Sequence, residues 1–257
     1  MNKMKWLAAI AVVLTSGLLQ ADLVALNPNK DTVMRASGTT DEADYGAATQ
    51  LLANSPRMLF SFDLASVSGS ITNAVLKLTM ANSPTTVAWN YVVSPMVYTA
   101  NNYSWLEGAG TSSTALESIQ PADATSAASY KWRRNGVTDL QWENLSGTGL
   151  NNMANAELWG ASIGSASGTS WVSGNTITIA LTASMLETFR TNGVGSITIG
   201  IDTTGTTASS SPFVWSKEAA SAGNRPVLEL QVIPEPATLG LFVVSSLGII
   251  LIRRVFR

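Results

Sequence analysis

The sequence predicts an all-β protein: a single jelly-roll or β-sandwich domain with one short helix, flanked by an N-terminal signal helix and a C-terminal single transmembrane helix. Short runs that alternate apolar and polar residues occupy the middle of the chain, and clusters of Gly, Asn, Ser and Pro separate them. Both ends of the 257-residue chain are instead continuously apolar beside basic residues. The body between them, residues 22–232, is long enough for one domain with a sizeable core.

The N-terminus has the order of residues of a secretory signal peptide, which would span residues 1–21. Two lysines precede an apolar stretch, and Leu19-Gln20-Ala21 approximates a small-x-small cleavage site. We expect cleavage between Ala21 and Asp22. A buried helix of a cytosolic domain is the alternative, but the positive start, apolar middle and cleavable end favour export.

Five runs in the body show, at least in part, the period-2 alternation of half-buried strands. They are residues 57–63, 74–80, 175–181, 196–202 and 226–232. One short helix is expected between the third and fourth runs, because Ser184 and Glu187 have the spacing of a capping box. Phe189 continues its apolar face and Gly193 supplies a stop, so this helix would close one end of the sandwich.

The region from about Asn101 to Gly174 is less regular and is rich in Ala, Ser, Gly and Asn. A loop of this length inside a compact domain is usually functional or poorly ordered. We therefore look for a binding site here. The region holds five of the eight tryptophans: Trp105, Trp132, Trp142, Trp159 and Trp171.

The composition excludes several classes of function. The chain has no cysteine and no histidine, which rules out disulfides, Ser-His-Asp and Cys-His nucleophiles, and every His-ligated zinc or iron site. A hard ion bound by oxygen ligands, such as Ca²⁺, stays possible. From Asp22 to Ile233 there are 10 basic and 16 acidic residues, a net charge of −6, with no basic stripe for nucleic acid.

The C-terminus combines a Pro-Glu-Pro break, an apolar run and a basic end. The run from residue 237 to residue 252 carries no charge, and its 16 residues fall short of the roughly 20 of a comfortable membrane span. Arg253 and Arg254 would stay in the cytoplasm, leaving the body outside. Pro234 and Pro236 prevent the last strand from continuing into the helix.

Residues 233–257 resemble the PEP-CTERM sorting segment of Gram-negative bacteria, with the motif at 234–236 (Pro234, Glu235, Pro236), the hydrophobic helix at 237–252 and the basic tail at 253–257. The resemblance implies export by the Sec machinery, transient anchoring in the inner membrane, and processing by an exosortase, a membrane-embedded cysteine protease. A permanent tail anchor is the alternative.

Several short blocks are spread over the body: residues 31–35 (Asp-Thr-Val-Met-Arg), 44–46 (Asp-Tyr-Gly), 57–64, 71–78, 104–108 (Ser-Trp-Leu-Glu-Gly), 216–218 (Ser-Lys-Glu) and 224–228. In these blocks the body resembles DNRLRE-type domains, which are similar to jelly-roll carbohydrate-binding modules of secreted bacterial proteins. The resemblance implies a jelly-roll fold and a carbohydrate ligand. The chain departs from the family pattern between residues 111 and 174, where the family's short Thr-Trp-Asn turn is not evident.

A sugar site needs an aromatic face for the pyranose ring and polar groups at the rim for its hydroxyls. Trp132 beside Lys131, Arg133 and Arg134 is the most suggestive cluster, because cations next to an aromatic ring suit an acidic polysaccharide. The alternative is that Trp132 packs under the sandwich and the basic residues are solvated. Trp105 is expected to be a core residue.

A structural Ca²⁺ is the one cofactor considered, and none is required. Asp31, Asp63 and Glu218 lie in the family-like blocks and could converge on a hard cation. Nothing in their spacing demands it. The alternative is that they are strand-end carboxylates that accept hydrogen bonds from the backbone or from Arg35 and Arg225.

We therefore expect an exported, non-catalytic protein of the cell surface or extracellular biofilm matrix that binds or organises extracellular polysaccharide. A purely structural matrix or surface protein without a sugar site is the alternative, and a polysaccharide-degrading enzyme is a third. Exposed tryptophans beside Arg133 and Arg134 would favour binding, and buried tryptophans with a featureless acidic surface would favour the structural role. A deep cleft with two facing carboxylates of unequal pKa would favour the enzyme.

Overall fold

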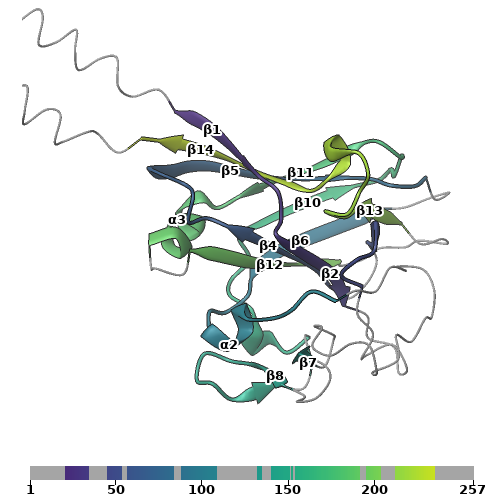
Figure 1. Ribbon diagram of the computed structural model, residues 1–257. Coiled ribbons are helices and arrows are strands. Elements are labelled where there is room, and N and C mark those ends of the chain that lie inside the picture. Colours follow the sequence, from purple (N-terminus) through teal and green to yellow (C-terminus); the bar gives the residue numbers. More distant parts are fainter. Residues whose placement is uncertain are drawn as a thin grey trace, which may run out of the picture.

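The computed structural model confirms that the body is an all-β protein built from antiparallel sheets (Figure 1). The described residues are 21–34, 45–53, 57–83, 88–108, 132–134, 140–150, 152, 154–191, 195–203 and 212–234, with only the backbone described at 132–134 and 140.

Two larger sheets make up most of the described part. The first has the strand order β1-β14-β5-β11, with bounds Asp22–Leu26, Val227–Ile233, Ser70–Thr79 and Thr176–Leu181. The second has the order β10-β6-β12-β4-β2, with bounds Gly164–Gly168, Trp89–Pro95, Ser196–Thr203, Arg57–Asp63 and Lys30–Met34. The five strands predicted from alternation lie in β4, β5, β11, β12 and β14.

Two smaller antiparallel sheets complete the strands that the described residues form. One pairs β13 with β3, whose bounds are Phe213–Trp215 and Gln50–Leu52. The other has the order β7-β8-β9, with bounds Trp132–Arg134, Leu140–Glu143 and Gly149–Leu150.

The main hydrophobic core lies between the two larger sheets, in a β-sandwich-like arrangement. In β11 the isoleucines and the leucine are buried while the intervening residues are exposed, so one face packs inward and the other faces solvent. The core joins residues of both sheets, among them Leu76, Ile177 and Ile179 from the first and Phe60, Phe62 and Ile199 from the second.

The second sheet is also covered on its outer face, by the segment that connects β6 to β10. There a second core contains Leu59 of β4 and Trp105 and Trp142 of the connecting segment, all fully buried. This explains why β4 is buried on both faces rather than half-buried, as its alternation predicted. The segment expected to be irregular contains α2 (Ala100–Tyr103), β7, β8, β9 and the 3-10 helix η2 (Ala156–Leu158).

Helix α3 (Ala183–Thr191) lies between β11 and β12 in the chain, as predicted, at one end of the sandwich (Figure 1). Its start differs from the prediction: Ser184 is already helical, so it does not cap the helix. The Glu187 carboxylate instead accepts a hydrogen bond from the Ile71 amide at 3.1 Å and pairs with Arg190 at 2.6 Å. Glu187 thus fixes the helix to β5.

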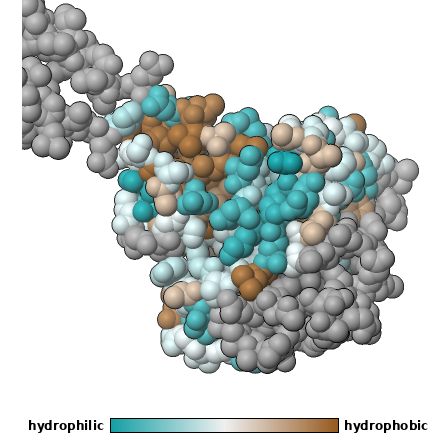
Figure 2. Space-filling view, viewed as in Figure 1, coloured by the Kyte–Doolittle hydropathy of each residue, from teal (hydrophilic) through white to brown (hydrophobic). Residues whose placement is uncertain are grey.

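The two ends of the body leave the sandwich side by side (Figure 1), because Asp22 of β1 is paired with Val232 of β14. Apolar side chains gather over β1 near this point (Figure 2), and Leu23 is 67% exposed. The predicted signal helix and hydrophobic sorting helix lie outside the described residues. Among the helices of the described part, none is long and apolar enough to cross a membrane.

Candidate functional site

A pocket of about 550 Å³ opens in the segment that covers the outer face of the second sheet. It lies between the turn that joins β8 to β9 and the stretch that follows the 3-10 helix. We call it the Trp159 pocket. Its lining residues are Val97, Asn144, Leu145, Ser146, Glu157, Trp159 and Gly160.

Hydrogen bonds fix the walls of the Trp159 pocket. The Asn144 side-chain oxygen accepts from the amides of Ser146 and Thr148, at 3.0 and 2.9 Å, which holds the β8–β9 turn closed. The Asn144 amide nitrogen donates to Glu157 Oε2 at 2.7 Å and so joins the two walls. Asn155 caps the 3-10 helix by accepting from the Glu157 amide at 3.0 Å. The polar side chains of the pocket are therefore pre-positioned.

Trp159 is held against the outer face of the second sheet. The Arg57 guanidinium carbon lies 3.8 Å from the centre of its indole ring, and Arg57 forms a bidentate ion pair with Asp202. Gly200 permits this approach, because a Cβ there would lie only 2.5 Å from the ring. The ring is half-buried and lines the pocket from a rigid base.

The lining combines an aromatic ring with two uncharged polar side chains and one carboxylate. Glu157 is the only charged side chain in the lining, and Leu145, at the rim, is 74% exposed. An indole beside amide and carboxylate oxygens can hold a sugar, because the ring contacts the apolar face while the polar groups bond to hydroxyls.

A second group of polar side chains, which we call the Asp31 cluster, surrounds the buried Asp31 at the edge of the sandwich. Asp31 Oδ2 accepts from the Lys217 amide at 2.6 Å, and the Asp31 amide donates to Glu107 Oε1 at 2.6 Å. Lys217 Nζ pairs with Glu107 Oε2 at 2.9 Å and also with Glu218. Burial raises the pKa of Asp31 to about 8 and also raises that of Glu107.

The Asp31 cluster joins segments that are far apart in the sequence. Lys30 Nζ donates to the Trp105 carbonyl at 2.7 Å, and a Cβ on Gly46 would lie 2.5 Å from the Gly108 amide nitrogen. Four of the family-like blocks, at 31–35, 44–46, 104–108 and 216–218, thus have residues here. Because the Asp31 carboxylate is buried, this arrangement indicates a structural junction rather than an open site.

The three predicted Ca²⁺ ligands do not converge. Asp31 is paired with Phe60 across β2 and β4, and Asp63 lies three residues further along, roughly 10 Å away. Asp63 is exposed and accepts from the Ala65 amide at 2.8 Å, which is the strand-end alternative. Glu218 does lie in the Asp31 cluster, but Lys217 occupies it as the counter-ion. In the described part of the chain, no three acidic residues are grouped to hold a metal.

Three of the four predicted sugar residues lie on a strand that neighbours the Trp159 pocket. Trp132, Arg133 and Arg134 form β7, which pairs with β8, the strand that leads into the pocket's turn. Their side chains, and Lys131 as a whole, lie outside the described residues. Binding by this cluster stays a prediction.

Most of the other described tryptophans are core residues. Trp105 is fully buried, as expected, and its indole nitrogen donates to Thr198 at 3.3 Å. Trp89, Trp142 and Trp171 are buried as well. Reasoning from the sequence did not distinguish Trp159 from Trp142 and Trp171, since no local motif marks it.

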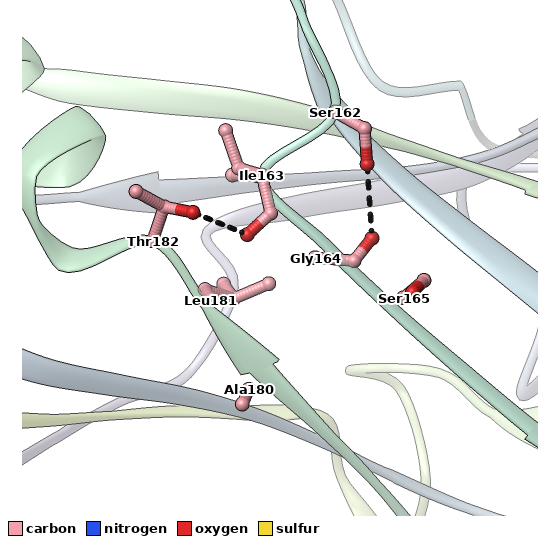
Figure 3. A pocket seen from close by; sticks show the side chains of 7 residues that line it. All are labelled: Ser162, Ile163, Gly164, Ser165, Ala180, Leu181 and Thr182. Carbon is pink, nitrogen blue, oxygen red and sulfur yellow. Dashed lines mark hydrogen bonds between the residues drawn. The ribbon is translucent and has the colours of Figure 1, made fainter.

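A second hollow lies where the edge strands β10 and β11 of the two sheets approach each other (Figure 3). Two of its three polar side chains have partners within the hollow: the Ser162 hydroxyl donates to the Gly164 carbonyl, and the Thr182 hydroxyl donates to the Ile163 carbonyl (Figure 3). Its lining has neither an aromatic ring nor a charge. It therefore offers less to a sugar than the Trp159 pocket does.

No protein-family model matches the chain, and no curated protein matches it either. The resemblances to PEP-CTERM segments and DNRLRE-type domains therefore depend on the residues quoted above.

Proposed function

We propose that this chain is an exported, non-catalytic jelly-roll protein that binds extracellular polysaccharide through the Trp159 pocket. The strand orders β1-β14-β5-β11 and β10-β6-β12-β4 support the jelly-roll assignment, because consecutive strands repeatedly cross between two antiparallel sheets of four. The edge strand β2 extends the second of these sheets.

The observation that carries the binding proposal is the indole of Trp159, half-buried on a rigid base and lining a pocket with Asn144 and Glu157. A ring that is already ordered in the free protein stacks on a sugar more favourably, because ordering a side chain on binding lowers affinity. A single aromatic platform supports affinities of roughly millimolar to tenth-millimolar for a short oligosaccharide.

A non-catalytic role is consistent with where the perturbed carboxylates lie. Asp31 and Glu107, whose pKa values are raised by burial, belong to the Asp31 cluster and do not line the Trp159 pocket. Two carboxylates at hydrolase spacing on either side of a sugar are what a glycoside hydrolase would need.

We further propose that the chain is delivered by the Sec machinery and cleaved between Ala21 and Asp22. The Pro234-Glu235-Pro236 segment would then hold it at the inner membrane of a Gram-negative bacterium until an exosortase processes it. Pairing of Asp22 with Val232 supports this scheme, because both membrane-directed segments leave from one end of the body. The protein would finally reside at the cell surface or in the biofilm matrix.

A purely structural matrix protein is the second candidate. Burial of Trp89, Trp105, Trp142 and Trp171 favours it, because these rings serve packing. If no glycan binds at the Trp159 pocket or at the β7 cluster, the structural role becomes the better account.

The test is a binding screen of the purified protein against neutral, acidic and amino polysaccharides, followed by tryptophan fluorescence with and without Ca²⁺. Saturable binding that Trp159→Ala weakens at least about tenfold, and that Trp132→Ala leaves intact, is expected. Loss in Trp132→Ala alone would move the site to the β7 cluster. Absence of binding by the folded protein would overturn the proposal.

A further inference from the structure

We infer that the Trp159 pocket selects polysaccharides whose sugars carry a free amino group, an ammonium at neutral pH, over acidic ones. This inference depends on the proposed glycan-binding function of the same pocket. It concerns the chemical class of the ligand, and it reverses the expectation of an acidic polysaccharide that the basic residues beside Trp132 raised.

The charge of the pocket carries the argument. Glu157 is an exposed carboxylate, and within the described residues it forms no ion pair. Only its Oε2 atom is engaged, by the uncharged amide of Asn144, so a cation can approach the other oxygen. Uronate or sulfate groups would meet a like charge, which disfavours them.

The cation nearest to the indole does not reverse this sign. Arg57 stacks on the ring of Trp159, but its bidentate ion pair with Asp202 neutralises the guanidinium charge. Glu157 therefore sets the sign of the charge in the lining.

The spacing of the two groups suits an amino sugar. Glu157 and Trp159 are two residues apart on the 3-10 helix and its C-cap, and both line the same pocket. A hexosamine stacked on the indole could direct its ammonium to Glu157 Oε1, and an ammonium beside an indole also gains cation–π attraction. An N-acetylated sugar could stack equally well but would lack the ion pair.

The test compares glucosamine oligomers with N-acetylglucosamine oligomers of the same length, by calorimetric titration of the purified full chain in mild detergent at pH 6. We expect the deacetylated oligomer to bind about five- to tenfold more tightly, with a preference that falls as salt rises. Glu157→Gln should remove this preference, because it weakens binding of the deacetylated oligomer more than binding of the acetylated one. Glu229→Gln, on the opposite sheet, is the matched control and should change neither.

The outcomes separate the inference from the proposed function. Equal or tighter binding of the acetylated oligomer, lost in Trp159→Ala, would overturn the inference and leave the glycan-binding function standing. A preference for the deacetylated oligomer that survives Glu157→Gln would overturn the inference as well. Binding of neither oligomer, and of no other glycan in the screen, would overturn both.

Discussion

Replacing Asp31 with Asn should remove much of the dependence of stability on pH between about pH 4 and pH 8. Asp31 is fully buried on β2, and burial raises the pKa of its carboxyl from 3.8 to about 8. Glu107, Lys217 and Glu218 are the charged groups that face it. The folded protein therefore retains a proton on Asp31 that the unfolded chain releases.

The sign and size of the effect follow from this difference. A carboxyl with a raised pKa in the folded state contributes its full stability below about pH 4 and loses it as the pH rises towards 8. One extra proton bound by the folded state gives a slope of up to about 1.4 kcal/mol of unfolding free energy per pH unit. An Asn side chain can still accept from the Lys217 amide, but it cannot ionise.

The assay is urea unfolding of the wild type and Asp31→Asn at pH 5, 6, 7 and 8. As the pH rises from 5 to 8, the unfolding free energy of the wild type should fall by more than about 2 kcal/mol relative to that of the variant. Asp63→Asn, which removes an exposed carboxylate from the same sheet, is the control and should leave the slope unchanged. A difference that is constant with pH, or that moves against the variant, would refute the reasoning.

Three further changes test the packing. Arg57→Ala should lower the free energy of unfolding by about 3 kcal/mol, because Asp202 loses its ion pair and Trp159 loses the guanidinium stacked on its ring. A denaturant midpoint equal to that of the wild type would contradict this. Gly46→Ala should lower the stability measured by thermal melting by about 1–3 kcal/mol, since its Cβ would lie 2.5 Å from the Gly108 amide nitrogen. Gly223→Ala, with open space around it, is the control and should be nearly neutral, so equal effects would contradict the junction at the Asp31 cluster. Trp142→Ala should cost about 3–5 kcal/mol in urea, because the ring is fully buried in the second core, and a loss below about 1 kcal/mol would mean that the ring is exposed in solution.

The sequence was informative where structure is decided locally. Strand β11 alternates over Thr176–Leu181, and its burial follows that alternation, with every second side chain buried and the others exposed. Strand β10 could not be predicted, because Gly-Ser-Ala-Ser-Gly has no apolar period and becomes a strand only by pairing with β6. Strand β4 was predicted, but the second core that buries its outer face was not, since that core comes from the segment between β6 and β10.

The candidate site was less accessible from the sequence for the same reason. The environment of Trp159 is set by Arg57 and Gly200, which lie on strands distant in the chain. The link between Asp31 and Lys217 spans 186 residues. Acidic residues in family-like blocks suggested a common Ca²⁺ site. The register pairs Asp31 of β2 with Phe60 of β4, however, and Asp63 lies three residues further along β4, which no local spacing reveals.

The most direct test of the central claim is an NMR titration of the tryptophan indole N–H signals with a soluble amino-sugar oligomer. The account predicts that the Trp159 signal, assigned by its disappearance in Trp159→Phe, shifts in a saturable way. The signals of the buried Trp89, Trp105, Trp142 and Trp171 should stay in place, because their rings are packed in the two cores. A Trp159 signal that does not move at millimolar oligomer, or a saturable shift confined to other tryptophans, would contradict it.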